Sequence, residues 1–155
     1  MASYDLIVVG LGAWGSSALY HAAQAGLRVL GLDRFAPPHK VSAHHGQGRM
    51  IRMASPEAPD YTPMMARAYA LWHRLEREWG EPLIRTDGGC YVGRRDSEIV
   101  AGALASFAGT DLAHELLDTG AARRRFPWLA VQDGESVLWE PSCGVIHPEN
   151  AIRAP

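Results

Sequence analysis

The sequence contains few cysteines and no long apolar run. Cys90 and Cys143 form no Cys-x-x-Cys pair, so free thiols in a reducing compartment are expected. The first aliphatic run, Leu6 to Val9, stops at Gly10 and follows no basic residue, which excludes an ordinary secretion signal. No stretch approaches the roughly 18 apolar residues of a membrane span. These absences predict a cytoplasmic protein with no membrane partner.

The chain of 155 residues also lacks a strong charge of either sign. Its formal net charge is -2, with 47% hydrophobic and 21% charged residues. These values are ordinary for a soluble globular protein and give no electrostatic reason to expect nucleic acid as a partner. Lys40 is the one lysine among 15 basic residues, which we interpret as a compositional bias. No metal site is predicted, because neither His114 nor His147 has a partner at metal-ligand spacing.

The strongest motif present is VVGLGAWGSSALYHAAQAG, near the N-terminus. It follows an aliphatic run over residues 5–9 that is typical of a parallel strand buried on both faces. A small-residue helix over residues 13–25 comes next, and LRVLGLD then predicts a second strand over residues 27–33. Together these elements form a β-α-β unit over residues 4–34.

The spacing of the glycines in this motif suits a dinucleotide. Gly10 allows a tight turn, Gly12 lets the backbone approach a pyrophosphate, and Gly15 lets the helix pack closely on the strand. The helix N-terminus supplies free N–H groups and partial positive charge to the phosphates. Asp33, about 20 residues on, can accept hydrogen bonds from ribose hydroxyls. It would repel a 2′-phosphate, which disfavours NADP, but the pattern does not separate FAD from NAD.

Beyond a loop rich in Pro, Gly and His, helices are predicted to alternate with short strands. Apolar residues from Tyr61 to Trp79 recur at helical spacing, which predicts an amphipathic helix that ends at Gly80. Further elements are expected in GGCYVG (strand), residues 96–107 (helix capped by Asp96 or Ser97), AHELLD (strand), TGAARRRFPWL (helix), SVLWEPSCGVI (one or two strands) and HPENAIRAP (helix start). A doubly wound fold needs more parallel strands than these. We therefore expect an α/β fold with an incomplete sheet, the N-terminal part of a longer protein.

A second informative stretch is SAHHGQGRMIR, within a loop over residues 42–53. Arg49 and Arg52 are three residues apart, so a helical turn that starts near Gly48 would place them on one face. The alternative interpretation is a solvated basic turn with surface histidines.

Five segments resemble, in order, the monomeric sarcosine oxidase and N-methyl-amino-acid oxidase family, within the D-amino-acid-oxidase-like group of FAD enzymes. They are YDLIVVGLGAWGSS, GLDRFAPPH, HHGQGRMIR, ALWHRLE and EPSCGVIHPENAIRA. The resemblance covers essentially all 155 residues. It implies a Rossmann-like, glutathione-reductase-type FAD-binding region over residues 1–155, with the dinucleotide unit at 4–34. The flavin- and substrate-facing loop would be 42–53, and helical and substrate-domain elements would occupy 61–155.

The resemblance also implies roles for individual residues. Arg34 would lie beside the adenine, and His45 and Arg49 would be catalytic at the isoalloxazine end, where a cation stabilises charge on reduced flavin. Arg52 would clamp the substrate carboxylate with its guanidinium fork. The implied cofactor-binding residues are Gly10, Gly12, Gly15, Asp33, Arg34, His44, Gly46 and Arg49.

The implied reaction oxidises the C–N bond of a small secondary or N-methyl amino acid that has a free carboxylate, and the 155-residue chain alone is expected to be inactive. The flavin takes a hydride equivalent, the imine hydrolyses, and molecular oxygen reoxidises the flavin to give hydrogen peroxide. The sequence departs from the family at Gly48, where a hydroxyl residue is usual, and at Ala43, which separates Ser42 from the paired histidines.

Two alternatives stay open. An NAD-dependent Rossmann dehydrogenase would use the same glycine turn but would give the loop around His44 to Arg52 no role. A truncated, non-catalytic fragment would expose strand edges and would be expected to aggregate.

Overall fold

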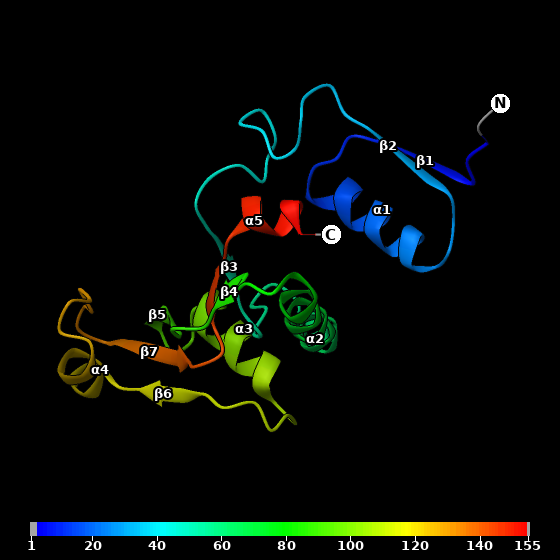
Figure 1. Cartoon of the computed structure of the whole chain (residues 1–155). Helices are drawn as coiled ribbons and strands as arrows, with labels where there is room; N and C mark the ends of the chain where they lie inside the picture. Colours follow the sequence, from blue (N-terminus) through cyan, green and yellow to red (C-terminus); the bar gives the residue numbers. More distant parts are fainter. Residues whose placement is uncertain (1–2, 155) are drawn as a thin grey trace. The chain divides into compact units, whose positions relative to one another are not determined.

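The computed structural model describes residues 3–154, and the chain divides into two compact units (Figure 1). Unit 1 comprises Met1–Arg49, Leu75–Leu83 and Ile146–Pro155. Unit 2 comprises Met50–Arg74 and Ile84–Val145.

Unit 1 is organised around the predicted β-α-β motif. β1 (Leu6–Val9) pairs in parallel with β2 (Val29–Leu32). The connecting helix α1 (Ala13–Gln24) lies against both strands. α5 (Pro148–Arg153) begins with its proline in the first turn and contacts α1. The strand, helix and second strand are therefore confirmed at nearly the predicted boundaries.

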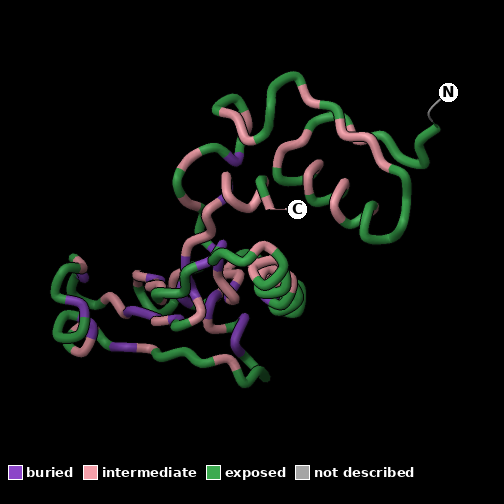
Figure 2. The backbone as a smooth tube through the Cα atoms, in the orientation of Figure 1, coloured by how far each residue is buried: buried purple, intermediate pink, exposed green. Residues whose placement is uncertain are grey.

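The prediction that the first strand is buried on both faces is wrong. Ile7 is 53% exposed and Val9 is 82% exposed. Among the described residues, β2 is the one strand that pairs with β1, and α1 has no buried residue. A two-stranded sheet beside a single helix cannot enclose both faces of a strand. Figure 2 accordingly shows this region in green and pink.

Unit 2 contains an antiparallel sheet covered by two helices. β5 (Gly89–Arg94), β7 (Glu135–Glu140) and β6 (Glu115–Leu117) are arranged in the order β5-β7-β6. α3 (Glu98–Phe107) contacts β5 and β7, and α4 (Thr119–Arg125) contacts β6 and β7. All five elements confirm predicted ones.

Neighbouring side chains of β7 point to opposite faces of this sheet, and both faces are buried. Leu138 packs with Tyr91 and Phe107 in one cluster, whereas Val137 packs with Phe126 in the other. The purple segments of Figure 2 mark this double core. The double core therefore encloses β7 from both faces of the sheet.

Capping residues define where the helices of unit 2 begin. The side chain of Ser97, one of the two predicted caps, accepts a hydrogen bond from the Val100 N–H at the start of α3. Asp118 caps α4 in the same way by accepting from the Ala121 N–H. Both contacts satisfy a backbone donor that has no partner within its helix.

The predicted long helix is α2 (Thr62–Trp79), preceded by the 3-10 turn η1 (Pro59–Tyr61). Tyr69 is buried, and its hydroxyl donates to the Ser142 carbonyl at 2.6 Å. Tyr61 and Met64, expected on the packing face, are 52% and 65% exposed. No helix in the described part of the chain is long and apolar enough to span a membrane.

Three short strands form a further sheet, in the order β3-β8-β4. They are β3 (Arg49–Ile51), β8 (Gly144–Ile146) and β4 (Ile84–Arg85). The helical turn considered near Gly48 is therefore wrong: the chain is extended there because it pairs with β8. Arg49 and Arg52 share no helical face.

Candidate functional site

The turn over residues 10–15, called the glycine turn below, closes directly onto the end of the parallel strand pair. Gly10 has φ +93°, a conformation that favours glycine, and its N–H donates to the Leu32 carbonyl at 2.7 Å. A Cβ on Gly15 would overlap the Gly10 carbonyl oxygen. The absence of side chains at these two positions is what lets α1 start so close to β1.

The N-terminus of α1 presents unpaired backbone donors. Its N-cap residue, Gly12, provides no side-chain cap, and the first turn contains no acidic residue. The first N–H groups of a helix have no partner inside it, and the helix dipole adds positive charge there. A Cβ on Gly12 would meet just the His44 ring among the described residues, with Nδ1 at 3.5 Å. This arrangement fits a phosphate or diphosphate group.

Asp33 connects the glycine turn to the end of β2. Its Oδ2 accepts from the Leu11 N–H at 2.7 Å, and its Oδ1 accepts from the Phe35 N–H at 3.0 Å. Hydrogen bonds from Phe35 and Leu11 hold the pKa of Asp33 below its ordinary value, so the carboxylate is ionised. A carboxylate oxygen can accept more than one hydrogen bond, so Oδ2 retains capacity for a hydroxyl donor.

His39 is a neighbour of Asp33 that the sequence did not single out. Its Nε2 lies 3.2 Å from Asp33 Oδ1, within ion-pair distance but outside hydrogen-bond geometry. Its Nδ1 is buried without a hydrogen-bond partner in the described part of the chain. His39 also makes an edge contact with Phe35.

His44 is the buried member of the histidine pair, with 6% exposure. Ser42 Oγ lies 2.9 Å from His44 Nε2 and donates its proton to the His39 carbonyl at 3.0 Å. The hydroxyl therefore accepts from Nε2–H, which leaves His44 Nδ1 as an acceptor. Burial lowers the pKa of His44, and the neighbouring His39 adds to the effect, so a neutral imidazole is favoured. The alternative interpretation, a solvated turn with surface histidines, therefore holds for the exposed His45 but not for the buried His44.

Arg49 organises residues 42–49, called the histidine loop below. Its Nη2 donates to the Ala43 carbonyl at 2.7 Å and to the His45 carbonyl at 2.9 Å, and its Nη1 donates to the Gly48 carbonyl at 2.8 Å. The guanidinium is exposed while it holds these carbonyls together. Its positive charge therefore sits in a loop of defined shape.

Two residues from a distant part of the sequence hold the same loop. The Gly46 N–H donates to Glu149 Oε1 at 3.2 Å, and His147 Nδ1 lies 3.2 Å from the Gln47 carbonyl oxygen. The segment HPENAIRAP predicts a helix start, but nothing in its sequence indicates a role for these side chains. No local spacing links positions about 100 residues apart, so no pattern in the sequence could have found them.

The remaining predicted site residues are Arg34 and Arg52. The Arg34 guanidinium lies over the Phe35 ring at 5.4 Å. Arg52 belongs to unit 2, whereas the glycine turn and the histidine loop belong to unit 1. Its Nη2 contacts both carboxylate oxygens of Glu57, at 2.7 and 2.9 Å. Within unit 1 the structure brings together Gly12, Asp33 and His44.

Residues 3–154 contain no candidate site for a metal ion. No group of three or more His, Cys, Asp or Glu side chains in this range could hold an ion. The two thiols are free, and burial raises the pKa of both Cys90 and Cys143. Neither thiol is activated as a nucleophile.

The chain matches a known family over nearly its whole length. The sequence profile described as FAD dependent oxidoreductase covers residues 5–154. A monomeric sarcosine oxidase of Streptomyces avermitilis is 43% identical over 152 residues, which is 98% of this chain and 40% of that protein. An N-methyl-L-tryptophan oxidase of Yersinia pestis is 38% identical over 150 residues, covering 97% of this chain and 40% of that protein. The chain thus spans about 40% of the length of these relatives.

Solved structures show the same fold. NikD, described as an unusual amino acid oxidase essential for nikkomycin biosynthesis, superposes with a TM-score of 0.83 at 25% identity over 99% of this chain and 40% of that one. The L-proline dehydrogenase from P. horikoshii gives a TM-score of 0.76 at 20% identity, with 98% and 40% coverage. The similarity to the L-proline dehydrogenase concerns the fold alone.

Proposed function

Because this chain belongs to the FAD dependent oxidoreductase family, we propose that unit 1 binds FAD and that the protein oxidises the C–N bond of an amino acid. The members of this family are enzymes that depend on FAD. Membership favours FAD over NAD, although both cofactors suit a glycine turn. The free thiols are compatible with a cytoplasmic protein.

The residues present fit the parts of FAD. The first-turn N–H groups of α1, next to Gly12, would hold the diphosphate, and Asp33 would accept from the adenosine ribose. Arg34 would lie beside the adenine. Gly46 and Arg49, with His44 and His45, would face the isoalloxazine. When bound, FAD supplies the two-electron oxidation that converts the C–N bond to an imine and passes electrons to oxygen, giving hydrogen peroxide.

Arg52 is proposed to bind the substrate carboxylate. The relatives are named for the oxidation of sarcosine and of N-methyl-L-tryptophan, two N-methyl amino acids of very different size. The carboxylate and the methylated amine are what these substrates share. A guanidinium binds carboxylates well, and Arg52 already contacts one, that of Glu57. We therefore propose small secondary or N-methyl amino acids as substrates and oxygen as the electron acceptor.

The observation that carries the proposal is the uncapped N-terminus of α1 beside a carboxylate that is fixed on the same turn. The Leu11 N–H donates to Asp33 at 2.7 Å, so the donors for a diphosphate and the acceptor for a ribose belong to one hydrogen-bonded group. A nucleotide that spans both would bind without reorganising the backbone.

The test is FAD binding by the Gly12→Ala variant, measured by quenching of flavin fluorescence. A methyl group there contacts His44 at ordinary distance, so the fold is retained, but it occupies the approach of the diphosphate. We expect FAD affinity to fall at least about ten-fold, the loss of one good charge-assisted contact.

Gly120→Ala in α4 is the matched control, because its Cβ also meets neighbours at ordinary distance, 3.4 Å. FAD affinity should be unchanged in this variant. The proposal fails if Gly12→Ala binds FAD as tightly as the unsubstituted protein, or if NAD displaces FAD at equal concentration.

A further inference from the structure

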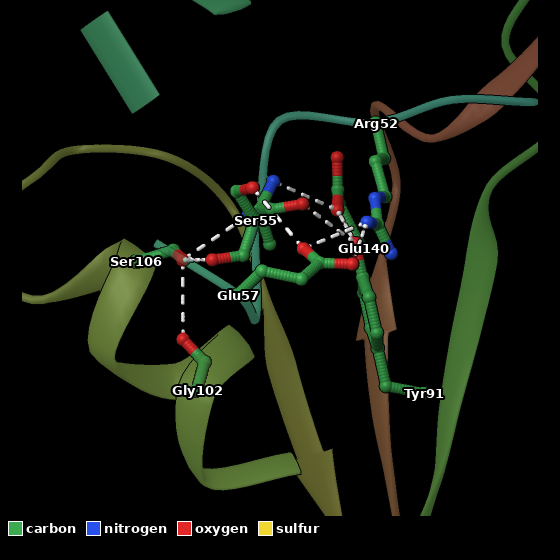
Figure 3. Close-up of polar contacts among 8 residues, drawn as sticks. Arg52, Ser55, Glu57, Tyr91, Gly102, Ser106 and Glu140 are labelled. Carbon is green, nitrogen blue, oxygen red and sulfur yellow. Dashed lines mark hydrogen bonds and ion pairs between the residues drawn. The ribbon is translucent and has the colours of Figure 1, made fainter. Parts of the chain in front are cut away.

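A buried carboxylate lies beside the proposed substrate arginine, and no step of the proposed reaction uses it. Glu140, the last residue of β7, is 0% exposed. Its Oε1 accepts from the Met53 N–H at 2.6 Å and from the Ser142 hydroxyl at 2.7 Å. Its Oε2 accepts from the Tyr91 hydroxyl at 2.7 Å and from the Ala54 N–H at 3.3 Å. Figure 3 shows this carboxylate below the turn that follows Arg52.

Burying a charged group is costly unless hydrogen bonds compensate for the lost water. Two of the four donors to Glu140 are consecutive backbone N–H groups, Met53 and Ala54. A consecutive pair can reach one carboxylate only if the chain turns around it. The carboxylate therefore selects one path for the backbone immediately after Arg52.

Neighbouring contacts hold the same segment. The Tyr91 hydroxyl also lies 3.3 Å from the Ala54 carbonyl oxygen, and burial raises the pKa of Tyr91, so it remains a protonated donor. The Ser55 N–H donates to Ser106 Oγ at 3.1 Å, and this hydroxyl donates to the Ser55 carbonyl at 2.9 Å. By contrast Glu57, the partner of the Arg52 side chain, is largely exposed. The backbone that follows Arg52 is therefore held by buried hydrogen bonds, whereas its side chain is held by an exposed carboxylate.

We infer that Glu140 is a positioning residue for Arg52: it locks the backbone at Met53 and Ala54 and so sets where the guanidinium can meet a carboxylate. This inference rests on the proposed role of Arg52. It predicts that Glu140 influences substrate binding without touching the substrate.

The first measurement is amide hydrogen exchange of Met53 and Ala54 in Glu140→Gln. Glutamine presents an NH2 group where the carboxylate had an oxygen, so at least one donor of the set loses its acceptor. Exchange at these two amides should accelerate at least about ten-fold, while the amides that pair β5 with β7 remain protected. Thr119→Val is the matched control: it removes the bond from its hydroxyl to the Glu135 carbonyl, at the opposite end of β7.

The second measurement compares binding of propionate and propionamide to the flavin-loaded protein, followed by the flavin absorption spectrum. Glu140→Gln should weaken propionate binding at least about five-fold and leave propionamide nearly unchanged, since only the carboxylate can form a bidentate ion pair with a guanidinium. When an N-methyl amino acid is used as the substrate to be oxidised, Glu140→Gln should raise KM by a larger factor than it lowers kcat. Thr119→Val should change neither ligand.

The outcomes separate the inference from the proposed function. If the unsubstituted protein does not prefer propionate to propionamide, the proposed role of Arg52 fails. If it does, and Glu140→Gln keeps that preference or keeps slow exchange at Met53 and Ala54, the positioning role is overturned. Should Glu140→Gln not fold, Tyr91→Phe serves instead: it removes one donor to Oε2 and should give smaller changes in the same direction, and their absence would equally overturn the role.

Discussion

Asp33 and Glu140 are carboxylates that the fold uses in different ways. Both accept backbone N–H groups, and both fix the chain next to a proposed ligand group. Asp33 remains able to accept a further donor, which suits a residue that binds. Glu140 is enclosed with four donors, which suits a residue that positions. The difference follows from burial and from the number of partners each carboxylate already has.

The acid stability of unit 1 should depend on Asp33. Its pKa is lowered in the folded state, so its contribution is complete above the ordinary value of 3.8 and is lost as pH falls through the lower folded value. The melting temperature of Asp33→Asn should therefore lie below that of the unsubstituted protein at pH 7. The gap should close as the pH falls below 3.8. A gap that is the same at pH 7 and in strong acid would show that the ionised Asp33 carboxylate does not stabilise the fold.

Arg52 and Glu57 should affect carboxylate binding in opposite directions. Arg52→Ala should weaken propionate binding at least about ten-fold with little change in flavin content, because the charge-assisted contact is lost. Glu57→Gln removes a competing carboxylate. It should tighten propionate binding by only about two- to five-fold, because an exposed ion pair is worth little. Titrations of flavin absorption measure both constants, and weaker binding by Glu57→Gln would exclude competition.

At the scale of elements, two chain segments approach each other closely where one of them has a glycine, because glycine has no side chain. In α3, a Cβ on Gly102 would overlap the Pro56 carbonyl oxygen. The helix therefore packs directly on the segment that follows Arg52, and Ser106, one turn later, bonds Ser55. α3 thus supports the backbone that Glu140 holds from the other side, as Figure 3 shows.

Gly102→Ala should destabilise the protein although alanine favours helices. The intrinsic gain is about 1 kcal/mol. The overlap is with backbone, which cannot rotate away, and overpacking typically costs about 1–3 kcal/mol. Gly120→Ala in α4 has no such overlap and should be neutral or stabilising. Urea denaturation of the two variants checks the difference; equal stabilisation by both would show that α3 can move away from Pro56.

At the scale of the whole molecule, buried side chains are distributed unequally between the units. Among the described residues of unit 1, three are buried: His44, Leu83 and Pro148. Unit 2 carries both clusters of the double core. Local stability follows buried apolar contact, so unit 1 should open at lower free energy than unit 2.

Native-state hydrogen exchange should resolve this difference. Amides that pair β1 with β2 should exchange at least about a hundred-fold faster than those that pair β5 with β7. Saturating FAD should slow exchange in unit 1, because a ligand stabilises the state that binds it. Equal protection in both sheets would show that buried apolar contact does not set the local stability of the two units.

Much of the fold could be predicted because its signals are local. The β-α-β unit, the long helix, a cap at Asp96 or Ser97 and the strands β5 to β8 follow from periodicity and from turn and cap residues, whereas β4 was not predicted. The exposure of β1 and the strand at Arg49–Ile51 could not be predicted, because both depend on which segments lie alongside. The glycine turn was recognisable from spacing, whereas the roles of individual site residues remain predictions.

The amino-acid sequence by itself determined the β-α-β unit and the glycine turn with Asp33, since each depends on residues close together in the chain. It also indicated a flavin-dependent family, through segments that resemble that family along the whole chain. Only the tertiary structure placed Glu149 against Gly46, 103 residues away, and Glu140 against Ala54, 86 residues away. The physical reason is that a hydrogen bond depends on the distance between two atoms in space. Sequence periodicity gives no information about a partner that lies far away in the chain.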